Sequence, residues 1–155
     1  MSKEQDRKYR VTLTEDQLRI ISNCLESESR MLCGQLNHSC IFAFRNLSLT
    51  KSSEDMNLVN SKLFEIKSIL FPELEQNMSH GLGHQKLPDL MYDMYKSIRK
   101  ELKRVQDEEN ISNGKKVYSN VDDHGPMGLT DRPILIVEHL SQEVIRDENI
   151  NKIIK

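Results

Sequence analysis

Apolar residues recur at the spacing of an α-helix in three stretches of the chain, and these stretches predict the core. In the first, Thr14 and Gln17 match a capping box, and an apolar stripe extends the helix to about residue 46. In the second, Ser52 or Ser53 can cap a helix that Pro72 limits. The third follows Pro88, which suits a first helical turn. The three stripes are Leu18, Ile21, Leu25, Leu32 and Leu36; Val59, Leu63, Ile66, Ile69 and Leu70; and Leu87, Leu90, Met91, Met94, Tyr95, Ile98, Leu102 and Val105.

Shorter apolar stretches predict strands near both ends of the chain. Residues 9–13 alternate apolar and polar side chains, 134–137 form a continuous apolar run after Pro133, and 117–121 form a weaker candidate. The first two can pair within one chain or between subunits. The predicted fold class is therefore α+β and mostly helical: three main helices with short N- and C-terminal strands forming a small sheet, in an oligomer.

The length of 155 residues suits one domain. We expect a single domain over 1–155, with a polar arm at 1–8, a core at 9–140 and an amphipathic tail at 141–155. Residues 72–86 lose all periodicity and are expected to form a loop. The five aliphatic side chains of the tail suggest docking, for example onto a partner subunit.

Composition narrows the class of protein. The net charge of −2 argues against a surface built to neutralise duplex nucleic acid, so any anion site must be local. The absence of Trp, with four Tyr and four Phe, disfavours a sandwich packed with aromatic residues. The charged N-terminus lacks the apolar segment of a signal peptide, and no apolar run approaches the roughly 18 residues of a membrane span. We therefore expect an intracellular soluble protein.

The motifs of known catalytic sites are missing from the sequence. It has no nucleophile elbow, phosphate-binding P-loop, dinucleotide fingerprint or zinc-protease motif. Three cysteines without CxxC spacing are read as reduced thiols. His80 and His84, with Asp89 nearby, allow a metal site, but two histidines in one loop are more typical of a surface or ligand contact. We expect no catalytic residue, metal or cofactor.

Two features point to recognition of an anion. Lys96, Arg99, Lys100 and Lys103 share one stripe of the third helix, which is either a solvated face matched to the helix dipole or an anion site with Tyr92 one turn earlier. Gly34 is expected in the middle of the first helix, where it costs about 1 kcal/mol relative to Ala. Such a cost is typical of close approach by another helix or by a ligand.

Three segments, taken in order, resemble a family of small bacteriophage proteins. They are Ser29–Leu36 with the pattern SRxxxGQ, Asn77–Leu82 with NxSHGL, and Met91–Arg99 with YDMxxxIR. The family is the first Thoeris anti-defence family, whose members sequester signals of the cyclic ADP-ribose type. The resemblance covers about residues 9–140 and departs from the family pattern at Leu36–His38 and at Lys100, so it does not specify which nucleotide is preferred.

The resemblance implies a multimer, from dimer to hexamer, that binds cyclic nucleotides at subunit contacts without turnover in the host cytoplasm. Such a site needs cations for phosphate, flat rings for adenine and amides for its polar edge. The chain offers Arg30, Arg99 and Arg132 for phosphate, Tyr92 and Tyr95 for stacking, Gln35 and Asn77 for hydrogen bonds, and His80 in the loop motif. Tyr95 also fits the core stripe.

Two other functions remain open at this point. The chain can be a phage protein that inhibits or adapts a host protein through its apolar tail and helix faces. It can also be an enzyme that degrades the same nucleotides, although no acid–base or metal constellation stands out. We expect neither a membrane nor duplex nucleic acid as a partner.

Overall fold

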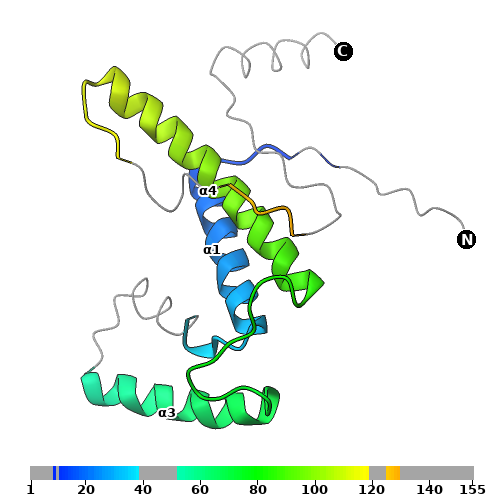
Figure 1. Cartoon of the computed structure of the whole chain (residues 1–155). Helices are drawn as coiled ribbons and strands as arrows, with labels where there is room; N and C mark the ends of the chain where they lie inside the picture. The colour runs from blue at the N-terminus through cyan, green and yellow to red at the C-terminus, as the bar shows by residue number, and fades with distance from the viewer. Residues whose placement is uncertain (1–8, 10, 39–51, 119–124, 130–155) are drawn as a thin grey trace, which may run out of the picture.

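The computed structural model describes residues 9, 11–38, 52–118 and 125–129, and this part of the chain is helical. The helices whose bounds are described are α1 (Glu15–Leu32), α3 (Ser53–Leu70) and α4 (Lys86–Ser112), and residues 36–38 are also helical. Helices α1 and α4 lie side by side, whereas α3 lies across the C-terminal end of α1 and is joined to α4 by the loop 71–85 (Figure 1). The site described below forms where that loop and α3 meet the end of α1.

Helix α1 starts as predicted but ends much earlier than predicted. The side chain of Thr14 accepts a hydrogen bond from the backbone N–H of Gln17, and the side chain of Gln17 accepts one from the backbone N–H of Thr14. These two bonds confirm the capping box. The helix ends at Leu32 because Gly34 adopts a φ of +85°, and the two C-terminal hydrogen bonds of a Schellman motif follow. The prediction that Gly34 lies inside a helix reaching residue 46 is therefore wrong.

Helix α3 confirms its predicted cap and end, and α4 confirms its predicted start but not its predicted end. Ser52 caps α3 through a capping box with Asp55, and the helix ends at Leu70, two residues before Pro72. Pro88 lies in the first turn of α4, where a backbone N–H has no partner within the helix, so the helix loses no hydrogen bond through the proline. Helix α4 continues past the predicted end at Val105 to Ser112.

The predicted sheet is wrong for the part of the chain that the structure describes, because no strand occurs there. Tyr9, Val11 and Leu13 are exposed coil, with Tyr9 81% exposed, and residues 115–118 are also coil. The backbone N–H and C=O groups of a strand need a neighbouring strand as hydrogen-bond partner. In a short alternating segment that has no such neighbour, these groups stay hydrogen-bonded to water. The strand predicted at 134–137, the polar arm and the tail lie outside the described residues.

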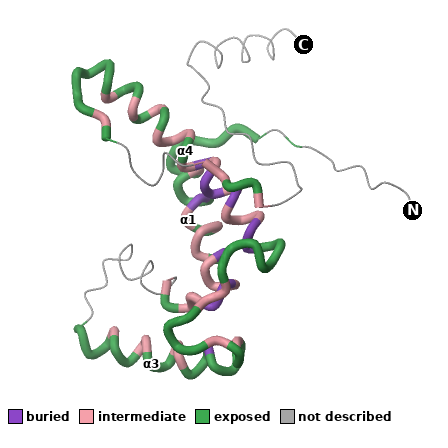
Figure 2. Tube along the Cα trace, viewed as in Figure 1, coloured by how far each residue is buried: buried purple, intermediate pink, exposed green. Residues whose placement is uncertain are grey.

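The most buried residues gather where α1 and α4 meet, and many of them are polar (Figure 2). Ile98 and Tyr95 of α4 are buried as predicted. In α1, however, the buried residues are Ser22 and Ser29, whereas Ile21 of the predicted core stripe is exposed. Ser22 and Ser29 lie four residues after Leu18 and Leu25, so they share the face of the predicted leucine stripe, whose leucines are partly buried while Ile21 lies at its edge. No described helix combines the length and apolar character needed to cross a bilayer.

Candidate functional site

A half-buried carboxylate, Glu26, joins two arginines at the contact between α1 and α4. Arg30 of the same helix donates from Nε to Oε1 at 2.9 Å, and Arg99 of α4 donates from Nη2 to Oε2 at 2.5 Å. Arg99 also donates to Ser22 Oγ at 3.1 Å and to Asn23 Oδ1 at 3.2 Å. We call these five residues the Glu26 cluster, and it connects the two helices through charge-assisted hydrogen bonds.

The Glu26 cluster carries a net positive charge. Burial raises the pKa of Glu26, but the hydrogen bonds and charges of Arg99 and then Arg30 outweigh it, so its pKa lies below the ordinary value of 4.5. Glu26 is therefore ionised at neutral pH and offsets one of the two guanidinium charges. The remaining charge favours an anion nearby, most directly at Arg30, which is the more exposed of the two arginines.

The tyrosines lie on the α4 side of the Glu26 cluster. The guanidinium carbon of Arg99 is 5.1 Å from the centre of the Tyr95 ring, and Tyr92 meets that ring edge-on at 5.1 Å. Burial, followed by the charge of Glu26, raises the pKa of Tyr95 to about 12. Tyr95 is thus a core residue with the guanidinium group of Arg99 over its ring. A place in the core was the second interpretation that the sequence allowed for this residue.

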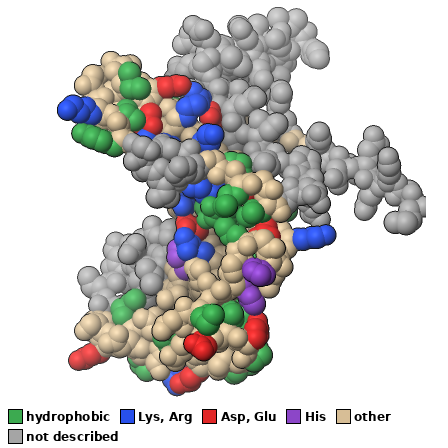
Figure 3. Space-filling model, viewed as in Figure 1, with side chains coloured by type: hydrophobic (Ala, Val, Ile, Leu, Met, Phe, Trp, Pro, Cys, Tyr) green, Lys and Arg blue, Asp and Glu red, His purple; other side chains and the backbone are tan. Residues whose placement is uncertain are grey.

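The basic stripe of α4 is not one open cationic face. Arg99 turns toward α1, Lys96 is buried, and Lys103 pairs with Asp107 one turn later. On the face shown in Figure 3, Lys and Arg side chains alternate with Asp and Glu instead of forming a continuous basic surface. The cations of this stripe therefore face different surroundings, and the binding of an anion by any of them stays a prediction.

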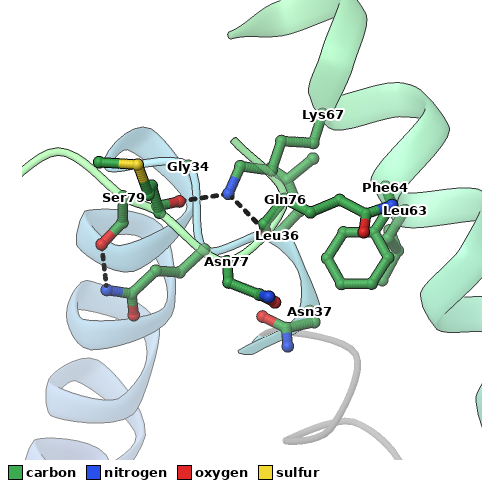
Figure 4. A pocket seen from close by; sticks show the side chains of 11 residues that line it. Gly34, Leu36, Asn37, Leu63, Phe64, Lys67, Gln76, Asn77 and Ser79 are labelled. Carbon is green, nitrogen blue, oxygen red and sulfur yellow. Dashed lines mark hydrogen bonds between the residues drawn. The ribbon is translucent and has the colours of Figure 1, made fainter. Parts of the chain in front are cut away.

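A hollow of about 230 Å³ opens beside the end of α1 (Figure 4). The turn after α1, helix α3 and the loop 76–79 form its walls. Its lining residues are Gly34, Gln35, Leu36, Asn37, Leu63, Phe64, Lys67, Gln76, Asn77, Met78 and Ser79. Amide, hydroxyl and ammonium groups thus face the same space as the ring of Phe64 and several aliphatic side chains.

Gln35 connects the hollow to the Glu26 cluster. Its Oε1 accepts from Nη1 of Arg30 at 2.9 Å, and its Nε2 donates to Ser79 Oγ at 3.1 Å. Asn77 lines the same hollow from the loop. Three predicted site residues, Arg30, Gln35 and Asn77, therefore lie on one continuous polar surface.

Gly34 allows the close approach that shapes the hollow. A Cβ at this position would lie 2.8 Å from Cδ1 of Leu74 and 3.7 Å from Cε of Lys67. Its positive φ alone disfavours any other residue. The sequence suggested close approach by a helix or a ligand, and the group that approaches is the loop after α3, together with the side chain of Lys67.

His80 fixes the loop and does not line the hollow. Its backbone N–H donates to Cys33 O at 2.9 Å, and its Nε2 lies 2.9 Å from Oε1 of Glu73. The rings of His80 and His84 are 6.4 Å apart, and within the described residues no group of three or more metal-binding side chains assembles. Asp89 accepts from the backbone N–H of Gly83 at 2.8 Å.

The predicted site residues thus fall into three places. Gln35 and Asn77 line the hollow, and Arg30 lies next to it through its hydrogen bond to Gln35. Tyr92, Tyr95 and Arg99 lie between α1 and α4. His80 holds the loop, and Arg132 lies outside the described residues.

Sequence reasoning missed Lys67 and Phe64. Their only signal was that Lys67 follows Phe64 by three positions and Leu63 by four, and a lysine at such a position usually belongs to a solvated face.

Comparisons with protein-family models, with curated proteins and with solved structures found no match for this chain.

Proposed function

We propose that this chain is a bacteriophage anti-defence protein that binds and sequesters cyclic nucleotide signals in the host cytoplasm without degrading them. The observation that carries the proposal is the bridge made by Gln35, which joins a net positive cluster to a polar hollow. Cyclic ADP-ribose isomers, and cyclic dinucleotides or trinucleotides, present both the phosphates and the base edges that such a surface recognises.

The proposed roles follow the chemistry of each group. Arg30 offers a planar fork of donors that suits phosphate oxygens, and its side chain is 39% exposed. Gln35 supplies amide donors and acceptors for a base edge, Asn77 adds a second amide group at the hollow, and Phe64 supplies a flat apolar surface. Binding without turnover is proposed because amides and cations hold a nucleotide but do not activate a nucleophile, which needs a base beside it.

The required affinity is within reach of such contacts. Sequestering a signal at nanomolar concentration requires about 12 kcal/mol of binding free energy. Hydrogen bonds to charged groups contribute about 1.5–3 kcal/mol each, and base stacking adds to them. A homo-oligomer with pockets at its subunit contacts, as the family resemblance implies, would enclose the ligand further and exclude water from those bonds.

One experiment tests the proposal against its alternatives. The protein is equilibrated with cyclic ADP-ribose isomers and cyclic dinucleotides, separated from the free ligand and denatured, and the released compounds are analysed by mass spectrometry. Intact nucleotide is the expected result, whereas an altered nucleotide would indicate an enzyme. Arg30→Ala should reduce retention at least tenfold. Arg19→Ala, which removes an exposed arginine paired with Glu15 on the same helix, should not.

A second candidate function is inhibition or adaptation of a host protein by direct binding. The observation that favours it is the exposed apolar surface of α3, which includes Leu58, Ile66, Ile69 and Leu70. If no nucleotide is retained, and Ile69→Gln abolishes the effect of the protein in the host while leaving its stability unchanged, this second function replaces the first.

A further inference from the structure

Lys67 is a buried cation whose hydrogen bonds within the described part of the chain go to uncharged groups. The residue lies in the last turn of α3 and is 5% exposed. Its Nζ donates to the backbone carbonyl of Gln76 at 3.0 Å and to that of Met78 (Figure 4). Among the described residues, no carboxylate lies within salt-bridge distance of this ammonium group.

The two carbonyls satisfy only part of what this ammonium group requires. It carries three N–H donors, so two acceptors leave one donor for another partner. Carbonyl dipoles stabilise the positive charge but do not neutralise it, and a buried charge without a counter-charge is costly. The residue lines the hollow, so a group bound there can supply both the missing acceptor and the missing negative charge.

We infer that the hollow is an anion site in which Lys67 binds a phosphate group of a nucleotide. The amide groups of Asn37 and Asn77 face the same space and provide further donors to phosphate oxygens. Phe64 and Leu63 provide an apolar wall for the attached sugar or base. This inference deepens the proposed function, because it assigns the phosphate to a lysine that the sequence motifs do not contain.

The size of the hollow indicates which part of the ligand it accommodates. Its volume of about 230 Å³ is below the roughly 300–1,000 Å³ of complete small-molecule sites. One phosphate and the sugar attached to it therefore occupy the hollow. The remainder of a larger nucleotide extends toward Gln35 and Arg30, which lie next to it.

The test compares a ligand that has a phosphate with one that lacks it. Binding of adenosine 5′-monophosphate and of adenosine to the full chain is measured by isothermal titration calorimetry. The monophosphate should bind at least tenfold more tightly, and inorganic phosphate should compete with it only at much higher concentration. Lys67→Met should abolish the difference between the two ligands, and Lys67→Arg should restore part of it. Competition by inorganic phosphate as strong as by the monophosphate would identify a site for free phosphate and overturn the nucleotide assignment.

A second variant covers the case in which Lys67→Met fails to fold, as judged by circular dichroism. Asn77→Asp places a carboxylate at the hollow, on an exposed loop residue. It should weaken the binding of the monophosphate at least tenfold and leave the binding of adenosine unchanged. Asn57→Asp makes the same change at an exposed position of α3 that does not line the hollow. It should alter neither the binding of the monophosphate nor that of adenosine. Equal binding of monophosphate and adenosine, or equal losses in the two aspartate variants, would overturn the inference.

The inference and the proposed function can fail separately. Monophosphate binding that depends on Lys67, without retention of any cyclic nucleotide, would refute only the proposed function. Retention of intact cyclic nucleotide that is unaffected by both Lys67→Met and Asn77→Asp would refute only the phosphate site.

Discussion

The contact between α1 and α4 and the surface of α3 distribute polar and apolar groups in opposite ways. Between α1 and α4, Ser22 is 1% exposed and Ser29 is 3% exposed, and the Glu26 cluster joins the helices through ionised groups. On α3, Ile69 is 79% exposed and Leu58 is 61% exposed. One region therefore buries hydrogen-bonded groups, whereas the other leaves aliphatic side chains in water.

The difference shows that the two regions depend on different interactions. Buried polar groups are stable only when their hydrogen bonds are made, so the α1–α4 contact specifies one orientation of the two helices. The apolar residues of α3 make few contacts within the described chain and contribute little to holding it together. Changes between α1 and α4 should therefore affect folding, and changes at the exposed apolar residues of α3 should affect only what binds there.

Arg99→Ala should have the largest effect on stability. It leaves Glu26 with one of its two cations and removes the bonds to Ser22 and Asn23. Because both members of the pair are largely buried, we expect the free energy of unfolding to fall by about 2–4 kcal/mol in urea titrations. The matched control is Arg19→Ala, which breaks an exposed pair on α1 and should cost at most about 0.5 kcal/mol. Equal losses would show that the Glu26 cluster has no special role.

Asp93→Asn should have the next largest effect. The buried carboxylate of Asp93 accepts from the backbone N–H groups of Met127 at 2.9 Å and Leu129 at 2.7 Å, and so holds the segment 125–129 against α4. An amide offers one acceptor where the carboxylate offers two, so we expect a loss of about 1.5–3 kcal/mol. Hydrogen exchange at these two N–H groups should accelerate, while that of α1 changes less. Unchanged exchange would show that Asp93 does not hold the segment.

Acid should weaken the α1–α4 contact through Glu26. The pKa of this carboxyl is lower in the folded chain than its ordinary value of 4.5, so the folded state binds fewer protons than the unfolded state. The stability that Glu26 contributes is therefore present above that value and is lost as the pH falls through the lower, folded pKa. Thermal unfolding measured across this range should show a smaller pH dependence in Glu26→Gln. An identical dependence would mean that other carboxylates account for it.

Ile69→Gln should have the smallest effect on stability. The side chain is 79% exposed, so the free energy of unfolding should change by less than about 0.5 kcal/mol in urea titrations. A loss of 2 kcal/mol or more, as estimated for Arg99→Ala, would show that the apolar face of α3 is covered in solution and would remove the contrast between the two regions.

Local patterns in the sequence predicted the helices but not their partners. The caps at Thr14 and Ser52 and the first-turn Pro88 were identified because each depends on residues only a few positions apart. The end of α1 was missed because a glycine within an apolar pattern is compatible with both a helix interior and a left-handed cap. The strand at residues 9–13 was wrong because an alternating pattern does not reveal whether a second strand lies beside it.

The candidate site shows the same division between local and distant information. The sequence by itself indicated Arg30, Gln35 and Asn77 as candidate site residues, since guanidinium and amide groups can bind phosphate and base edges. Only the tertiary structure decided that Arg99 pairs with Glu26, and that Lys67 faces the hollow with no carboxylate of the described residues beside it. The physical reason is that the charge available to a ligand depends on which groups meet in space, and those groups lie 9 to 77 positions apart in the chain.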